Sequence, residues 1–340
     1  MGASIHDVAA RSGVSKSTVS RVLTLDRRVR PATRLRVQQA IRELGYRPNA
    51  VARGLVHGRT RTIGLVVFDL SNPFFGLLVR GVEAVARGRG YNVLVCDSGG
   101  DETQQQECLA MMAERRVDGI LITPIDANDE ELAAIRQAGM RAVLVNSTAG
   151  DERVSSVGTD NVRGGWLATQ HLLELGHARV AFLGDSHAIP SCRERLSGYR
   201  MAHNRLGQPA DPALLIEDLT TMEGVVSAVH GLLDLPAPPT AMVAVNDHVA
   251  IAALQAALTR GRRVPEDVAL VGFDDIPVAA WLSVPLTTVA QSKEEQGAIA
   301  AALLLDQIEN STMPMQRVIL QPRLVVRESC GASRVVEKGA

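Results

Sequence analysis

The side chains with the clearest chemistry follow short apolar segments that the sequence predicts to be β-strands. Phe74 and Phe75 follow one such segment, and an adjacent pair is informative in a chain with only five Phe, three Tyr and two Trp. Their rings could stack on a sugar or a purine, or could simply pack in the core. The remaining candidates at strand ends are polar: Ser191, Arg195, Asn246, Asp247, Asp274 and Asp275.

These polar residue types suit the binding of a small polar molecule. A guanidinium such as that of Arg195, in a cleft with little water, can bind hydroxyls or a carboxylate through two hydrogen bonds. A carboxylate such as that of Asp274 can accept from two adjacent hydroxyls, as sugars and polyols require. Each acid or amide could instead cap a helix or form a hinge bond.

Three short motifs could indicate an enzyme, but each lacks the partners that the chemistry needs. Gly184-Asp185-Ser186 is similar to the start of some serine esterases, yet it lies mid-chain and no Asp-x-x-His follows it to supply a base. Gly88-Arg-Gly90 lacks the third glycine of a dinucleotide loop. Glu174 and His177 are too few ligands for a metal. We expect no catalytic residue, cofactor or metal; a serine hydrolase using Ser186 is a remote alternative.

Charge is unevenly distributed along the 340 residues. Residues 1–60 hold twelve Arg or Lys and three acids, whereas the remainder holds 24 basic and 34 acidic residues. A basic head on an acidic body indicates that the head alone has a polyanionic partner. A structural nucleoid protein would not need the large acidic body.

Composition favours a globular chain of two or three domains in the cytoplasm. Apolar residues make up 46% of it, and no apolar run approaches the roughly 18 residues that a membrane helix needs. The N-terminus has no apolar signal stretch, which argues against an exported sugar-binding transport protein. Four scattered cysteines without a C-x-x-C motif argue against a disulfide framework and fit a reducing cytosol.

The basic head predicts only short helices. Ser4 followed by Asp7 predicts a capped first helix. Ser15 can cap a second helix, Lys16–Leu23, and Pro31 occupies a first-turn position of a third. Three helices with a glycine-containing turn between the first two form a helix-turn-helix pattern.

Beyond Arg61, short β-rich segments alternate with helical stretches. The expected strands are 62–68, 92–96, 119–122, 142–145, 180–183, 241–245 and 268–272. This alternation predicts βαβ units whose parallel sheets are covered on both faces. Because there are too many strands for one sheet, we expect two α/β lobes with a cleft between their strand ends.

The stretch Ile5-His-Asp-Val-Ala-Ala-Arg-Ser-Gly-Val-Ser-Lys-Ser-Thr-Val-Ser-Arg-Val-Leu23 resembles the DNA-binding head of the Lac repressor (LacI/GalR) family almost position for position. The match continues through Gly45–Leu55 and resumes at Asn72-Pro-Phe-Phe75, Glu174-Leu-Gly-His177, Asn246-Asp247, Gly272-Phe-Asp-Asp275 and Pro285-Leu-Thr-Thr288. It covers about residues 3–329.

The resemblance implies an all-α helix-turn-helix head and an α/β body with two lobes like those of periplasmic binding proteins, each a parallel doubly wound sheet. We expect these boundaries: DNA-binding domain, 1–48; hinge helix and linker, 49–61; N-terminal subdomain, 62–161 with 291–321; C-terminal subdomain, 162–290 with 322–330; frayed tail, 331–340.

In the head, the family's base-contacting positions correspond to Lys16, Ser17 and Arg21, at the start of a helix that lies in the major groove. Hydroxyls are better suited to phosphate contacts, or to capping the helix. The other DNA-binding candidates of the head are Ser4, Ser15, Thr18, Ser20, Arg30 and Thr33. Arg30 is a departure, because most of the family has a serine there, and we expect it to contact phosphate.

The resemblance also implies a hinge helix that forms over the minor groove when two chains meet. Its candidate contacts are Asn49, Val51, Ala52 and Leu55. Leu55 matches a position whose side chain wedges between base pairs, although it could instead anchor the hinge on the body.

In the body, Arg195 matches the family's ligand arginine and Asp274 its hydroxyl-binding acid, while Asp160 and Gln291 match further lining positions. The chain is thus identified as a member of a family of DNA-binding repressors that a small molecule controls allosterically. We expect a homodimer on double-stranded DNA carrying a pseudo-palindromic operator, since no heptad tail follows Arg327-Glu-Ser. A sugar-like effector is favoured, and a purine corepressor is the alternative.

Overall fold

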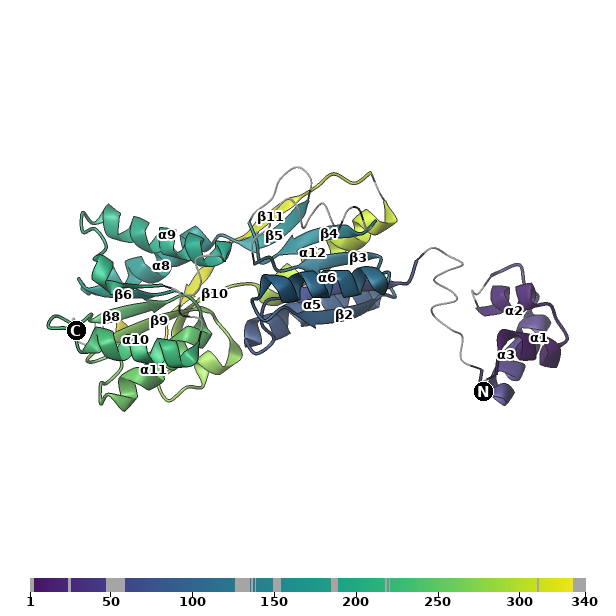
Figure 1. The fold of residues 1–340 in the computed structure, drawn as a ribbon, viewed down its shortest axis with the longest axis horizontal. Helices are drawn as coiled ribbons and strands as arrows, with labels where there is room; N and C mark the ends of the chain where they lie inside the picture. Colours follow the sequence, from purple (N-terminus) through teal and green to yellow (C-terminus); the bar gives the residue numbers. More distant parts are fainter. Residues whose placement is uncertain are drawn as a thin grey trace. The chain divides into compact units, whose positions relative to one another are not determined.

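The computed structural model describes residues 3–23, 26–46, 59–125, 135, 137, 139–148, 154–184, 189–217, 219, 221–310 and 312–332. The chain divides into two compact units, Met1–Thr60 and Arg61–Ala340 (Figure 1). We call them the head and the body. No helix among the described residues is both long and apolar enough to cross a bilayer.

The head is a bundle of α1 (Ile5–Ser12), α2 (Lys16–Leu23) and α3 (Pro31–Leu44) around a small core of its own. Ser4 and Asp7 form a capping box at the start of α1, as predicted. Val8, Val19 and Val37 are fully buried where the helices meet. The predicted helix-turn-helix head is therefore confirmed.

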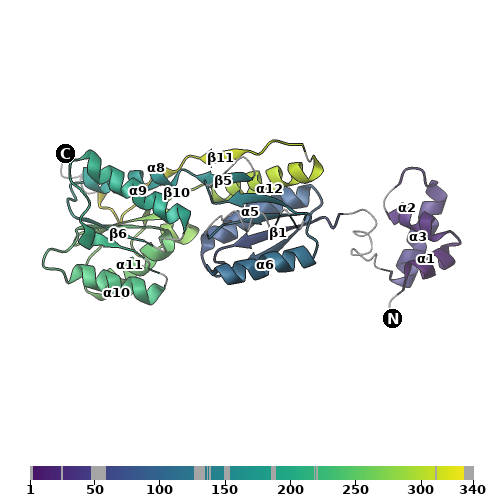
Figure 2. The same cartoon turned by 45° about the horizontal axis from the view of Figure 1, so that its top comes forward.

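The first lobe of the body, the N lobe, contains a parallel sheet in the order β11-β5-β4-β3-β1-β2. Its strands are β1 (Thr62–Val67), β2 (Asn92–Asp97), β3 (Gly119–Ile122), β4 (Arg141–Val145), β5 (Ser155–Thr159) and β11 (Arg317–Leu320). Helices α5 (Pro73–Gly88) and α12 (Lys293–Glu309) cover one face, and α6 (Glu102–Glu114) covers the other (Figure 2). Accordingly, Leu65 packs in the α5 cluster, whereas the next residue, Val66, packs in the α6 cluster.

The second lobe, the C lobe, has a sheet in the order β12-β10-β9-β8-β6-β7, in which β12 alone is antiparallel to its neighbour. Its strands are β6 (Val180–Leu183), β7 (Leu215–Ile216), β8 (Ala241–Ala244), β9 (Ala269–Asp274), β10 (Thr287–Ala290) and β12 (Arg323–Val325). Its helices are α8 (Asn161–Glu174), α9 (Pro190–Arg205), α10 (Met222–Leu233) and α11 (Asp247–Thr259), with short 3-10 turns η1 (Pro212–Leu214) and η2 (Pro277–Ala280). The predicted two-lobed α/β body is confirmed.

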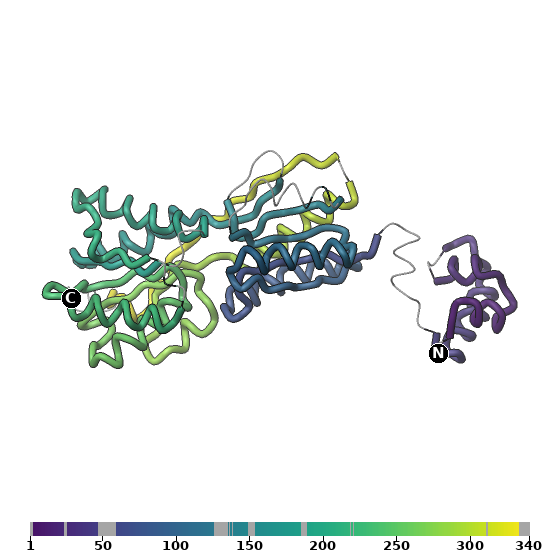
Figure 3. Tube along the Cα trace, in the orientation of Figure 1, coloured from purple at the N-terminus to yellow at the C-terminus, as the bar shows by residue number. Residues whose placement is uncertain are grey.

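The chain crosses between the lobes three times (Figure 3). The crossings are the residues between β5 and α8, between β10 and α12, and between β11 and β12. All seven predicted strands are present. Five further strands were not predicted: β5, β7, β10, β11 and β12. These strands are short, and β5 (Ser-Ser-Val-Gly-Thr) is buried although four of its residues are not large hydrophobics.

The scattered cysteines argued against a disulfide framework, and the described residues contain one disulfide. Cys96 on β2 and Cys108 on α6 are joined by a disulfide, with their Cα atoms 6.1 Å apart. Spacing alone did not indicate the pair because the turn between β2 and α6 brings the two positions together. Cys192 and Cys330 are free and buried.

Helices α8 and α9 pack backbone to backbone, and this contact positions Arg195. A Cβ atom on Gly165 would lie 2.1 Å from the carbonyl oxygen of Arg195. A Cβ atom on Gly198 would lie 2.0 Å from the carbonyl oxygen of Val162. Glycine is therefore required at both positions, because any side chain would push the helices apart.

Replacing Gly198 tests this contact. Gly198→Ala should lower the free energy of unfolding by about 1–3 kcal/mol, since the added methyl overpacks the interface. Gly231→Ala is the control: that helical glycine has no atom within 4 Å of a built Cβ, so alanine should stabilise by about 0.5–1 kcal/mol. Urea unfolding of both variants measures the difference. Equal stability would contradict the close packing.

Candidate ligand cleft and DNA-binding head

A cavity of about 390 Å³ lies between the two lobes of the body. Loops at the carboxyl ends of N-lobe strands line one side, and the starts of α9, α10 and α11 line the other. Ligands of open α/β sheets bind at this edge. Of the eight residues that the sequence analysis assigned to the cleft, six line the cavity: Phe74, Phe75, Ser191, Arg195, Asn246 and Asp274.

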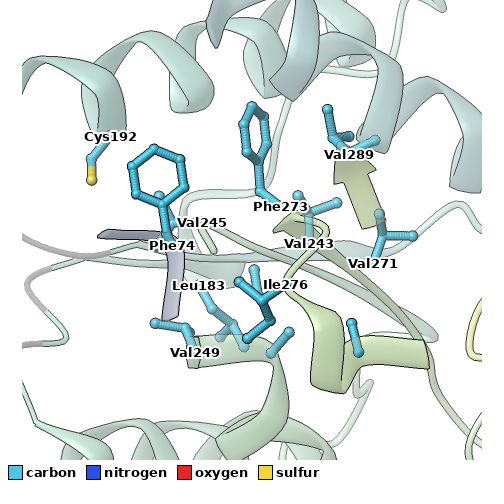
Figure 4. Close-up of a cluster of buried hydrophobic side chains, with 14 of the residues drawn as sticks. Phe74, Leu183, Cys192, Val243, Val245, Val249, Val271, Phe273, Ile276 and Val289 are labelled. Atoms are coloured by element: carbon cyan, nitrogen blue, oxygen red, sulfur yellow. The ribbon is translucent and has the colours of Figure 1, made fainter. Parts of the chain in front are cut away.

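Phenylalanine rings form the N-lobe wall of the cavity. Phe68 and Phe75 are stacked with centroids 6.5 Å apart, and Phe74 meets Phe75 edge-on at 5.1 Å. Phe74 is only 2% exposed and belongs to the same buried hydrophobic cluster as C-lobe residues such as Val245 and Val249 (Figure 4). The two rings therefore pack in the core and also line the cavity, so stacking on a ligand stays a prediction.

Arg195 lines the cavity, and other residues of the protein contact most of its guanidinium group. Its Nε donates to the side-chain oxygen of Asn161 at 3.0 Å, and its Nη1 donates to the carbonyl of Val245 at 2.7 Å. The guanidinium also stacks over the ring of Phe273, 3.8 Å from the centroid. Among the described residues, Nη2 of this cavity-lining arginine has no hydrogen-bond acceptor.

Asp274 is buried at the end of β9, 3.8 Å from Nη1 of Arg195. Its Oδ1 accepts from the amide of Gln291 at 2.6 Å. Burial raises the pKa of Asp274, whereas Arg195 and the Gln291 hydrogen bond lower it. Burial is the largest of these effects, and Gln291 holds Oδ1 at the edge of the cavity.

Two of the eight, Asp160 and Gln291, do not line the cavity. Asp160 instead caps α8, with its carboxylate accepting from the backbone N–H of Arg163 at 2.9 Å. Gln291 is buried, and its side chain donates to Asp274 and accepts from Gln296. Both residues lie where the chain crosses between the lobes, so their side chains can stabilise the crossing without contacting a ligand.

Several residues of the cavity were not predicted from the sequence, and most of them follow strands of the N lobe. Asn146 follows β4 with a positive φ of 55°, and its side-chain oxygen is buried without a hydrogen-bond partner among the described residues. The other polar residues of the described lining are Asp69, Asn72, Thr123, Ser147 and His248, and Gly99 and Gly100 also line the cavity. The position of Asn146 directly after a strand was the signal that could have identified it.

On the head, Lys16, Ser17 and Arg21 are exposed on α2, as contact with base edges would require. The capping role of Ser15 is realised, since its hydroxyl accepts from the backbone N–H of Thr18 at 3.2 Å. Arg30 precedes α3 without a side-chain cap and is exposed. Asn49, Val51, Ala52, Leu55 and Ser186 lie outside the described residues.

Comparison with known proteins agrees with this two-part architecture. Residues 4–49 match the profile of bacterial regulatory proteins of the lacI family, and residues 169–330 match a periplasmic binding protein-like domain. The chain is 36% identical over 330 residues to the HTH-type transcriptional repressor PurR of Aliivibrio fischeri (strain MJ11), covering 96% of this chain and 98% of that protein. It belongs to the LacI family.

Two solved structures are similar over nearly the whole LacI-family chain. One is a transcriptional regulator CelR–cellobiose complex, with 36% identity, a TM-score of 0.73 and coverage of 96% of this chain and 99% of that one. The other is the Lac repressor dimer bound to operator and the anti-inducer ONPF, with 27% identity, a TM-score of 0.85 and coverage of 97% and 99%. The relatives are repressors, and no group of three or more metal-binding side chains converges among the described residues of this family member.

Behind the cavity of this LacI-family body lies a second buried acid, Asp247. It accepts from the hydroxyl of Thr288 at 2.6 Å and from the backbone N–H of Ile276 at 2.9 Å. Burial, reinforced by the charge of Asp274, raises the pKa of Asp247 to about 8. The folded protein therefore holds a proton on this carboxyl at neutral pH, whereas the unfolded chain does not.

This raised pKa predicts a loss of stability as pH rises. Between about pH 4 and pH 8 the native state binds the extra proton, so Asp247 lowers the free energy of unfolding by up to about 1.4 kcal/mol per pH unit. Asp247→Asn replaces the protonated carboxyl with an uncharged group of nearly the same shape. It should reduce the change in the free energy of unfolding between pH 6 and pH 8, as measured by urea unfolding. Asp234→Asn, at an exposed position, is the control. An unchanged slope in Asp247→Asn would refute the assignment.

Proposed function

We propose that this LacI-family protein acts in the cytoplasm as a dimeric repressor whose operator affinity is set by a neutral, sugar-like effector in the inter-lobe cleft. The observation that carries this proposal is the pairing of a helix-turn-helix head with a cavity lined by Arg195 and Asp274. The protein is a sensor and not an enzyme in this proposal. The serine hydrolase alternative gains no support from the cavity residues that the structure describes, and Ser186 lies outside them.

The charge of the cavity supports a neutral ligand. Among the described lining residues, Asp69 and Asp274 stand beside one guanidinium, that of Arg195, and two of its nitrogens already donate to the protein. A phosphate or carboxylate would enter without a surplus of positive charge to bind it. Sugar hydroxyls suit the mixed acids and amides better, and the CelR relative was solved with cellobiose. A purine stacked on the Phe68–Phe75 wall is the alternative.

A second copy of the chain is the proposed partner of the body. Trp281 is 84% exposed and Val278 is 39% exposed on and beside η2, and large exposed hydrophobic side chains gathered in one place mark interaction surfaces. The Lac repressor relative was solved as a dimer on its operator. Two heads also match a pseudo-palindromic site, with one head on each half.

The two classes of DNA contact predict different defects. Lys16→Ala should relax discrimination at one base position and cost about 1–3 kcal/mol on the preferred operator. Arg30→Ala should weaken binding equally to all DNA sequences. It should also reduce the slope of the logarithm of the binding constant against the logarithm of the salt concentration by about 1. Operator titrations over a salt series, with Arg115→Ala on the body as control, measure both effects. A sequence-dependent defect in Arg30→Ala would exclude the phosphate role.

Arg195 provides the test of the effector cleft. A ligand at a hundred times its Kd should stabilise the protein by about 2.7 kcal/mol, which a thermal-shift screen of cellobiose, simple sugars, polyols and purines would detect. Arg195→Ala should lose that shift while it still binds operator. Arg193→Ala, an exposed arginine on the same helix, should keep it. A response that survives in Arg195→Ala would remove the cleft assignment, and a purine hit would select the alternative.

A further inference from the structure

The Cys96–Cys108 disulfide lies next to the turn that forms part of the cavity wall. The Cα separation of 6.1 Å is within the usual range for a disulfide. Both cysteines belong to the hydrophobic cluster between α6 and the N-lobe sheet. In a reducing compartment such a bridge is usually transient and redox-sensing.

The segment enclosed by the disulfide contributes directly to the cavity. Gly99 and Gly100 line it, both with positive φ. A Cβ atom on Gly100 would lie 2.7 Å from the ring of Phe68, so the turn packs tightly against the aromatic wall. The carboxylate of Asp97 accepts from the backbone N–H groups of Leu70 and Gly99, at 3.0 and 2.9 Å. The turn and the loop after β1 therefore form one packed unit.

We propose that Cys96 and Cys108 are a reversible redox modification site that regulates the effector cleft. This regulation rests on the proposed function, because it acts through the cavity wall. The bridge fixes the ends of the enclosed segment and restricts its local opening. A ligand that binds to a wall already ordered loses less conformational entropy. Oxidation should therefore raise effector affinity, and reduction should lower it.

The chemistry is thiol–disulfide exchange with a small disulfide such as oxidised glutathione. Cys96 is the half-buried partner, whereas Cys108 is only 6% exposed. The Cys96 thiolate attacks one glutathione sulfur, that S–S bond breaks, and one glutathione leaves as a thiol. The Cys108 thiolate then attacks the Cys96 sulfur and releases the second glutathione. Two protein thiols are oxidised to one disulfide, and one glutathione disulfide is reduced to two thiols.

The test compares the full chain equilibrated with reduced and with oxidised glutathione. After alkylation of free thiols, peptide mass mapping should find Cys96 linked to Cys108 only in the oxidised sample. Backbone amides of residues 98–101 should then exchange with deuterium at least about tenfold more slowly than in the reduced chain. Cys96→Ser and Cys108→Ser should abolish both changes, and Cys330→Ala should retain them.

Two results would overturn the redox site: a pair that stays unlinked across the glutathione range, or equal exchange in the two forms. Neither measurement uses an effector, and the wild-type comparison needs no variant to fold. Cellobiose serves as the separate affinity probe, and the oxidised chain should bind it at least about fivefold more tightly. If cellobiose fails to bind either form, the sugar-like effector class loses support, while the exchange result still decides the redox site.

Discussion

The buried carboxylate of Asp274 is the group around which the cleft is organised. A carboxylate removed from water costs several kcal/mol unless charges and hydrogen bonds compensate for it. Here Arg195 comes from α9, and Gln291 comes from the crossing before α12. Lys293, the first residue of α12, donates to the backbone carbonyls of Asp274 and Asp275. One strand end of the C lobe is thus held by residues that belong to both lobes or to the connection between them.

The support for this carboxylate extends well beyond the cavity. Arg195 can reach it only because α8 and α9 touch at Gly165 and Gly198. Asp275, the next residue, pairs with Arg327 near the last crossing at 2.6 Å. Burial lowers the pKa of Lys293, while the neighbouring acids Asp274 and Asp275 raise it. These charges compensate one another across the strand end and the lobe connections.

The sequence predicted best what depends on local patterns. Caps, turns and apolar periodicity identified the three head helices and the seven stronger strands. Six of eight cavity residues followed from their place at strand ends or from the resemblance. The failures share a cause in tertiary structure. Asp160 and Gln291 follow strands, but Asp160 caps α8 and Gln291 donates to Asp274, while the Cys96–Cys108 pair depends on how a turn folds. Small polar strands such as β5 are specified by their neighbours and not by their own sequence.

The form of the lobe connections determines which movement a ligand can drive. The three crossings are only one or two residues long: Asp160, Gln291-Ser292 and Gln321-Pro322. Three short parallel connections resist sliding, because all would have to stretch together, but they permit bending, which changes only a few backbone dihedrals. A ligand that contacts both the phenylalanine wall and the Arg195–Asp274 pair favours the closed lobes over the open ones. It can shift that equilibrium only by the difference between its affinities for the two states. Effector control is therefore strongest for a ligand long enough to contact both walls at once.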